Sequence, residues 1–352
     1  MKTAPCLEAL TNYLDLEIKD KPIEALIEAF TIYQVWDVCD KLKPFLNSSS
    51  ERIVSAAASY FYALTSEKKY LNKVFQLLQH ENRFVRQSAA FDLARIATIE
   101  CTNELLNANI PNNIKMFAIK SILYTSLEST SEQDSFNYTH QKKQLFSKLD
   151  QLVEENFSGN LLLDQGNTQG KRNGPSNNEQ ANTSLIDLFQ LLKSPSLQAR
   201  EAGIKGLSQH VQSTELVELY FSESDQDIKM GLIKAMAASA ESKFLPALID
   251  AIGVEIGNHC QGNIRRVAAR ALGFIGRSEQ NPSKIRDSIF EKLKWTLQYP
   301  DDWGLRYSAV LALEDLQTSA VRNILMLAEE KEIDLVVRTR MRRALSTTTS
   351  TT

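Results

Sequence analysis

A short pattern that recurs along the chain limits what this sequence can fold into. Its clearest copy lies at residues 300–313, where the aliphatic-basic pair Leu305-Arg306 is followed by small and apolar residues at helical spacing. These residues form one apolar helical face, and the alanines among them let a neighbouring helix approach closely. Before the pair, Pro300 ends one helix and Asp301-Asp302 cap the next. The stretch therefore predicts the junction of a helical hairpin.

The same aliphatic-basic pair recurs along most of the chain. The copies are Val85-Arg86, Ile114-Lys115, Ala199-Arg200, Ile228-Lys229, Ile264-Arg265, Leu305-Arg306 and Val337-Arg338, with an eighth, Ile53-Val54, that lacks the basic residue. An amphipathic first helix, as at 70–78 or 289–297, precedes the pair. Because one hairpin cannot bury its apolar face alone, neighbouring hairpins must stack. The sequence predicts an all-α fold, a HEAT-like or armadillo-like α-solenoid superhelix of about seven to eight hairpins, without a β-sheet.

One step in this series, between the pairs at 114 and 199, is much longer than the others. It has room for an added amphipathic helix around 140–157, and it contains QGNTQGKRNGPSNNEQANTS at 165–184. Such a polar segment cannot offset the entropy of ordering. We predict N-terminal repeats with an added helix at 1–160, a flexible polar linker or loop at 161–184, C-terminal repeats at 185–345 and a disordered tail at 346–352. A smaller irregularity at 253–263 predicts a lengthened hairpin turn.

Composition excludes several classes of protein. A formal net charge of −3 argues against a general nucleic-acid binder. Four cysteines that stand far apart, without a CxxC pair, predict neither a zinc site nor a disulfide framework and favour a reducing cytosol. No run reaches the roughly 18 apolar residues of a membrane span, and the first residues do not resemble a signal peptide. GxGxxG, GxxxxGK[ST], GxSxG and HExxH are all absent, so no metal site and no familiar enzyme template are expected.

Two second helices carry a more specific signature. Residues 263–273 read NIRRVAARALG and residues 301–314 read DDWGLRYSAVLALE. A generic HEAT repeat has no reason to place Trp303 and Tyr307 around Arg306. Both segments resemble the E/F-type phycobilin lyases of cyanobacteria and related plastids.

The resemblance implies an activity and its partners. A lyase of this family attaches an open-chain tetrapyrrole, a phycobilin, to a cysteine of a phycobiliprotein subunit through a thioether bond, with or without isomerising the pigment. The bilin is then a substrate, and no tightly bound cofactor is expected. The implied partners are the acceptor subunit and a second lyase subunit or a second copy of the chain. The implied location is the cyanobacterial cytosol or a plastid stroma.

The resemblance also implies roles for residues of the two segments. Arginine is the natural bidentate partner of the two bilin propionates, and aromatic rings form flat walls for the pigment. The bilin-binding candidates are Arg265, Arg266, Arg270, Trp303 and Arg306. The catalytic candidates are Asp301, Asp302 and Tyr307, of which the aspartates would hydrogen-bond pyrrole N–H groups and favour the protonated pigment. The attacking thiol would belong to the acceptor protein.

Structural interpretations compete with these roles. Arg86, Lys115, Arg200 and Lys229 fit ion pairs with turn aspartates of neighbouring repeats better than a binding role, and the same alternative stays open for Arg306. Asp301 and Asp302 are also expected to act as helix caps.

Trp295, between Leu293 and Leu297, fits the core better than a pigment wall. Cys260, beside His259, is expected to be an ordinary loop cysteine rather than an activated thiol. The arginines at 338, 340, 342 and 343 either dock an acidic partner or complement the end of a helix. For the whole chain, the alternative to a lyase is a non-catalytic HEAT-repeat scaffold or chaperone that binds a protein partner on its concave face.

Overall fold

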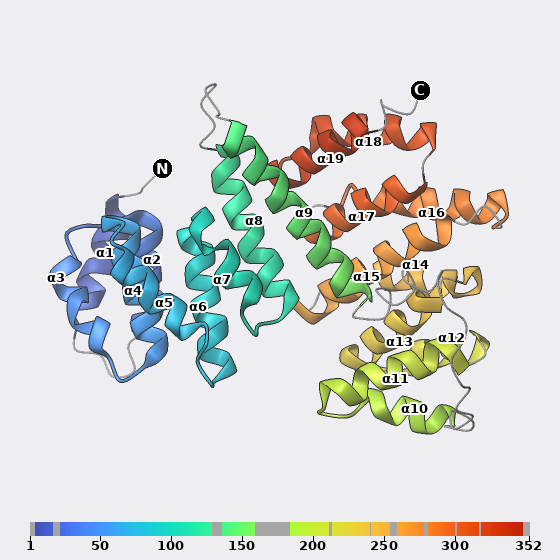
Figure 1. The fold of residues 1–352 in the computed structure, drawn as a ribbon, viewed down its shortest axis with the longest axis horizontal. Coiled ribbons are helices and arrows are strands. Elements are labelled where there is room, and N and C mark those ends of the chain that lie inside the picture. Colours follow the sequence, from blue (N-terminus) through green and yellow to red (C-terminus); the bar gives the residue numbers. More distant parts are fainter. Residues whose placement is uncertain are drawn as a thin grey trace. The chain divides into compact units, whose positions relative to one another are not determined.

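The fold is known from a computed structural model. It describes residues 4–16, 22–128, 136–158, 184–210, 213–239, 241–253, 259–277, 281–299, 301–316 and 318–347. Within these ranges every regular element is a helix, and none is a strand (Figure 1). The predicted all-α class is therefore confirmed. In the same ranges no helix combines the length and the apolar character needed to cross a membrane.

The chain forms two compact units, residues 1–149 and 150–352. The helices of the first are α1 (Ala4–Asp15), α2 (Ile23–Tyr33), α3 (Cys39–Leu42), α4 (Glu51–Thr65), α5 (Lys68–Leu77), α6 (Arg83–Ile96), α7 (Thr102–Asn107) and α8 (Asn112–Glu128). Short 3₁₀ turns lie at Lys43–Asn47 and Ile99–Cys101. Helices α4, α6 and α8 pack side by side, while α5 and α7 pair with the helix that follows each. The N-terminal core gathers around Ile27, Phe30 and Tyr60, from α2 and α4.

Helix α9 (Phe136–Ser158) is the predicted added helix, and its residues from Asp150 onward belong to the second unit. The other helices of that unit are α10 (Leu185–Leu192), α11 (Leu197–His210), α12 (Ser213–Ser222), α13 (Gln226–Ser239), α14 (Leu245–Gly253), α15 (His259–Gly276), α16 (Ser283–Thr296), α17 (Trp303–Leu316), α18 (Ser319–Lys331) and α19 (Leu335–Thr347). Each even-numbered helix from α10 onward pairs with the next helix, and α11, α13, α15, α17 and α19 pack in succession (Figure 1).

The eight copies of the sequence pattern match eight second helices: α4, α6, α8, α11, α13, α15, α17 and α19. In seven of them the aliphatic residue of the pair is the third residue of the helix. Helix α15 differs because it begins at His259, five residues before Ile264. The predicted long turn at 253–263 is therefore wrong for Gly253, which ends α14, and for its last five residues, and residues 254–258 lie outside the described part. The predicted solenoid of helical hairpins is confirmed.

The predicted linker and tail fall largely outside the described residues. Of the linker, only Ser184 is described, and it begins the second half of the chain as the N-cap of α10. Its hydroxyl accepts the N–H of Asp187 at 3.1 Å, and the Asp187 carboxylate accepts the Ser184 N–H at 3.3 Å. This capping box fixes where the C-terminal repeats start. Residues 346 and 347 of the predicted tail are helical, and the rest of it is not described.

The arginine of the repeated pair donates to the turn that precedes its own helix. Arg86 Nη1 donates to the carbonyl oxygen atoms of His80 and Glu81 at 2.7 and 2.8 Å. Arg200 Nη1 donates likewise to Ser194 and Pro195. These four acceptors lie in the turns between helices, so their carbonyls have no partner in a helical ladder. The predicted structural role is confirmed, but the prediction of ion pairs with turn aspartates is wrong for both arginines.

The two lysines in this series behave in related ways. Lys115 Nζ donates to the Leu106 carbonyl at 2.6 Å. The Lys229 ammonium lies 4.8 Å from the centre of the Tyr220 ring, so its described contact is with an aromatic face. In both hairpins a lysine of the second helix therefore contacts the first helix, through a carbonyl group in one and an aromatic ring in the other.

Close packing of α15 on α17 requires a glycine at position 273. A Cβ there would lie 2.6 Å from Ala312 Cα and 2.9 Å from Ala312 O. We expect Gly273→Ala to lower the free energy of unfolding by roughly 1 to 3 kcal/mol, because the two helices must move apart. Urea denaturation measures this. Gly253→Ala is the control, since its methyl would meet only Lys292 Nζ at 3.6 Å. A Gly273→Ala protein as stable as the wild type would contradict the packing.

Candidate functional site

The start of α17 brings three of the predicted site residues together. Asp302 is buried, and its Oδ1 accepts the Leu305 N–H at 2.9 Å, so the predicted cap is confirmed. Arg266 of α15 donates to the same oxygen from Nη2 at 2.7 Å and from Nε at 3.0 Å. Its guanidinium also lies 5.8 Å from the Trp303 ring centre. Gly304 leaves room for Arg266, because a Cβ at 304 would lie 2.6 Å from Arg266 Nε.

Accessibility separates the members of this group. Asp301 is exposed at the turn, and Trp303 is half-buried. The Arg266 side chain retains 19% of its accessible surface, whereas the Asp302 side chain retains 3%. Asp301, Arg266 and Trp303 are therefore the accessible residues at the start of α17. The buried Asp302 holds the Arg266 side chain in place through their ion pair.

Tyr307 lies one helical turn further on and is enclosed by protein. Its hydroxyl donates to Asp150 Oδ1 of α9 at 2.6 Å, and Arg340 Nε of α19 donates to the same oxygen at 3.1 Å. Burial raises the pKa of Tyr307 well above its usual value. Arg340 also donates from Nη2 to Glu314 at 2.5 Å. Arg340 was expected to dock a partner or to complement a helix end. It instead forms partly buried ion pairs with Asp150 and Glu314.

Arg270 belongs to the same interior network. Its Nε donates to Glu154 of α9, and its Nη1 donates to Asp315 of α17, each at 2.5 Å. Burial raises the pKa of Glu154, and the positive charge of Arg270 opposes that rise. Asp150 and Glu154 are four residues apart, on one face of α9. Two carboxylates of α9 thus neutralise Arg270 and Arg340, which come from two different second helices.

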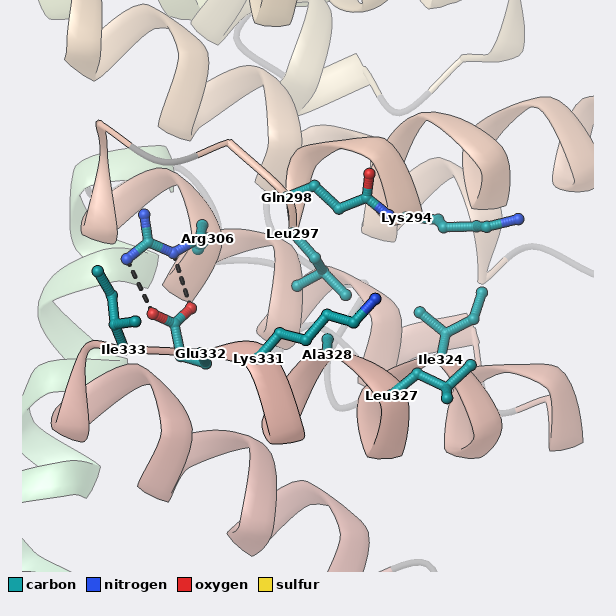
Figure 2. Close-up of a pocket in the computed structure, with 10 residues that line it drawn as sticks. All are labelled: Lys294, Leu297, Gln298, Arg306, Ile324, Leu327, Ala328, Lys331, Glu332 and Ile333. Carbon is teal, nitrogen blue, oxygen red and sulfur yellow. Dashed lines mark hydrogen bonds and ion pairs between the residues drawn. The ribbon is translucent and has the colours of Figure 1, made fainter.

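Arg306 is also buried and paired. Its Nε and Nη2 form a bidentate ion pair with Glu332, at 2.7 and 3.0 Å, and its Nη1 donates to the Tyr299 carbonyl at 2.8 Å. The pair forms one end of a pocket of about 530 Å³ between α16 and α18 (Figure 2). The lining residues are Lys294, Leu297, Gln298, Arg306, Ile324, Leu327, Ala328, Lys331, Glu332 and Ile333. Arg306 therefore forms an ion pair between repeats, as the structural interpretation expected, and it also lies on the wall of a pocket.

Arg265 differs from the other three predicted arginines. It is fully buried, its Nε donates to the Ile252 carbonyl at 2.8 Å, and its guanidinium stacks 3.9 Å from the Tyr299 ring centre. Its Nη1 and Nη2 have no hydrogen-bond partner. No carboxylate of the described residues pairs with it.

The sequence did not predict the exposure of Trp295, the contact of Lys292 with it, or an aromatic patch in the first unit. Trp295 is 44% exposed, so its predicted place in the core is wrong. Lys292 lies beside it, with Nζ 4.2 Å from the indole centre. In the first unit an aromatic patch is at least one-third exposed and consists of Phe84 and Phe91 on α6 and Phe117 and Tyr124 on α8. Its signal was a spacing of seven residues within each helix. Among the described residues no group of acids, histidines and cysteines is arranged to hold a metal ion.

The ion pair of Arg306 and Glu332 yields a stability prediction. Arg306→Met should lower the free energy of unfolding by about 3 to 5 kcal/mol, because it leaves the Glu332 carboxylate buried without a counterion. Chemical denaturation followed by circular dichroism measures the loss. Glu332→Met added to this variant should recover most of it, since no charge then stays buried. A double variant as unstable as the single one would contradict this account.

The hydroxyl of Tyr307 yields a second prediction. Tyr307→Phe removes a hydrogen bond to a charged acceptor, so we expect a loss of about 1.5 to 3 kcal/mol in the free energy of unfolding. Tyr299→Phe is the control, because no described hydrogen bond uses its hydroxyl and its stacking on Arg265 is retained. Equal stability of the two variants would show that the bond to Asp150 contributes nothing.

No family model matches the chain, but individual proteins do. PecF, a bilin biosynthesis protein, is 42% identical over 130 residues in Mastigocladus laminosus, which is 37% of this chain and 61% of that protein. PecF of Nostoc sp. is 40% identical over 131 residues, again 37% of this chain and 75% of that protein.

Other relatives match shorter parts. PecE of Mastigocladus laminosus is 42% identical over 113 residues, and phycocyanobilin lyase subunit alpha of Picosynechococcus sp. is 30% identical over 112 residues. Each match covers 32% of this chain and 42% of the relative. The chain thus spans 42% to 75% of the length of these relatives.

A solved structure, the complex of CpcE and CpcF of phycocyanin lyase from Nostoc sp., aligns with a TM-score of 0.40 at 20% identity over 46% of this chain and 96% of that one. The family assignment rests on the sequence matches, because PecF of Nostoc sp. is 40% identical and is matched over 75% of its length. The chain belongs to the E/F-type phycobilin lyase family.

Proposed function

We propose that this protein is a phycobilin lyase, which attaches an open-chain tetrapyrrole to a cysteine of a phycobiliprotein subunit. The observation that carries the proposal is the 40% identity to PecF of Nostoc sp. over 75% of that protein, whose name is bilin biosynthesis protein. The reaction adds the acceptor thiol across an exocyclic double bond of the pigment. A carbon–sulfur bond forms, and the thiol proton is balanced by a proton delivered to the pigment carbon.

The accessible group at the start of α17 suits this reaction. Asp301 presents an exposed carboxylate that accepts pyrrole N–H groups and favours the protonated, more electrophilic pigment. Trp303 offers a half-buried flat ring, and Arg266 a cation beside it. Asp302 is a positioning residue, because its carboxylate is already held by the Leu305 N–H and Arg266.

The buried residues serve this site by holding its shape. Tyr307, Arg270 and Arg306 are engaged with Asp150, Glu154, Asp315 and Glu332, so in this conformation they support the second helices. Direct contact of Tyr307, Arg270 and Arg306 with the pigment requires the pigment propionates to replace the protein carboxylates that now bind these residues. The proposal includes this contact together with that exchange.

The proposal extends to partners and location. The bilin is a substrate, and the acceptor is a phycobiliprotein subunit. A second lyase subunit, or a second copy of this chain, completes the enzyme. The name of a relative, phycocyanobilin lyase subunit alpha, supports the former. We place the reaction in a cyanobacterial cytosol or a plastid stroma.

Co-expression tests the activity. The chain is produced with a bilin-synthesising pathway and candidate phycobiliprotein subunits, with and without a second lyase subunit. A lyase yields an acceptor band that fluoresces with zinc on a denaturing gel and is lost when the acceptor cysteine is changed to alanine. A non-catalytic scaffold binds the acceptor protein but leaves that band colourless with every candidate.

The two aspartates before α17 should separate by role. Asp301→Asn should lower the rate of pigment transfer by about 100-fold or more and leave stability unchanged, because the exposed carboxylate is the proposed proton-transfer group. Asp302→Asn should instead lower the free energy of unfolding by roughly 1 to 3 kcal/mol, because the ion pair with Arg266 is lost. Transfer kinetics and urea denaturation measure both. Wild-type transfer by Asp301→Asn would remove Asp301 from the chemistry.

A further inference from the structure

The guanidinium of Arg265 lacks the partner that its counterpart in the next repeat has. Arg306 occupies the same position of the repeat and is bound bidentately by Glu332. Glu332 stands five residues before Val337, and the corresponding position before Leu305 is Pro300, which has no carboxylate. The chain therefore repeats the buried arginine but not its acid.

The absence of an acid leaves a charge imbalance. Arginine stays protonated in proteins, and a buried charge without a counterion is costly. Four buried side-chain atoms of the described residues lack a hydrogen-bond partner, and two of them are Nη1 and Nη2 of Arg265. The Ile252 carbonyl and the Tyr299 ring face the same guanidinium, but both are neutral. Two parallel N–H donors are thus present without an anion to receive them.

A second cation, Lys292, reaches the same end of α14 as Arg265. A Cβ at Gly253, next to the Ile252 that binds Arg265, would lie 3.6 Å from Lys292 Nζ. Burial lowers the pKa of Lys292, and the positive charge of Arg265 lowers it further, while Asp250 opposes the shift. The Asp250 carboxylate accepts the Tyr220 hydroxyl at 3.0 Å. Within the described ranges no ion pair is formed by Lys292. Arg265 and Lys292 therefore make a positive pair at the C-terminal end of α14, whose carbonyls offset only part of the charge.

Flat aromatic rings stand next to this pair of cations. Trp295 and Tyr299 have ring centres 5.8 Å apart, and Trp295 is 44% exposed. Lys292 lies over the indole and Arg265 over the phenol. A ligand suited to these surroundings combines a carboxylate with an extended flat apolar body.

From this arrangement we propose that Arg265 and Lys292 bind a carboxylate of the ligand, a propionate of the open-chain tetrapyrrole, with Trp295 and Tyr299 as a platform for its rings. The proposal rests on the proposed lyase function for the identity of the ligand. The propionate occupies the place that Glu332 takes on Arg306. Because Nη1 and Nη2 of Arg265 are enclosed in the free protein, the side chains around them rearrange when the ligand enters. Unlike Arg266, Arg270 and Arg306, Arg265 then binds the ligand without first giving up a protein carboxylate.

The test compares two probes with purified protein. Biliverdin carries two free carboxylates, and biliverdin dimethyl ester has the same ring system with both carboxylates masked. Absorbance titrations give the dissociation constants of the wild type, Arg265→Met, Lys292→Met and Lys284→Met. Lys284 is the matched control, because it is exposed on the same helix and does not line the pocket beside Arg306.

The expected result is a loss of affinity for biliverdin of about tenfold or more in Arg265→Met and Lys292→Met, with Lys284→Met like the wild type. The ester should bind the wild type more weakly than biliverdin does, and equally weakly to all variants. Wild-type affinity for biliverdin in Arg265→Met and Lys292→Met overturns the proposal. So does a wild type that binds the ester as tightly as biliverdin, or that binds neither.

Thermal unfolding separates ligand binding from a purely structural role. Arg265→Met removes a buried charge without a counterion, so its melting temperature should equal or exceed that of the wild type. A lower melting temperature with unchanged affinity overturns the proposal. Pigment transfer is measured separately. If Arg265→Met transfers pigment at the wild-type level, the proposed carboxylate site is refuted and the lyase function stands. If the wild type binds biliverdin through its carboxylates but transfers no pigment to any acceptor, the site stands and the lyase function is refuted.

Discussion

The fold depends on a bond that joins the second helix of a repeat to the turn before it. A cationic side chain in the first turn of the second helix donates to carbonyl oxygen atoms of that turn, as Arg86, Arg200 and Arg306 show. Those carbonyls lie outside the helices, so no N–H group of a helical ladder pairs with them. The bond sets the hairpin geometry, and the hairpin geometry lets successive second helices pack closely.

Close packing of second helices in turn decides where polar groups are found in the C-terminal unit. The alanines and Gly273 bring α15 within contact of α17, so arginines that would be exposed on separate helices become enclosed between them. An enclosed guanidinium must find an anion or a row of carbonyls. Arg270 and Arg340 find Glu154 and Asp150 on α9, and Arg306 finds Glu332. The network therefore serves the packing as much as any chemistry.

The proposed site lies where charged side chains stay accessible or have no partner of opposite charge. At the start of α17 the exposed Asp301, the half-buried Trp303 and the partly exposed Arg266 are available to a ligand. At the C-terminal end of α14 no carboxylate of the described residues pairs with the Arg265 guanidinium. A dianionic pigment with a flat body would be met at the first place by a ring and a hydrogen-bond acceptor, and at the second by two cations. Both places belong to the repeats whose segments carried the family resemblance.

The sequence by itself determined the architecture, because the positions of the aliphatic-basic pairs depend only on local helical periodicity and on the turn residues between helices. It predicted all eight second helices, the added helix α9 and the cap formed by Asp302. Tertiary structure decided which charges meet. Tyr307 binds Asp150, which is 157 residues away in the chain, and no local pattern relates the two. The placement of Trp295 at the surface and the missing acid of Arg265 were decided in the same way. Periodicity fixes the face of a helix on which a side chain lies, but whether that side chain is paired depends on residues brought to it by packing.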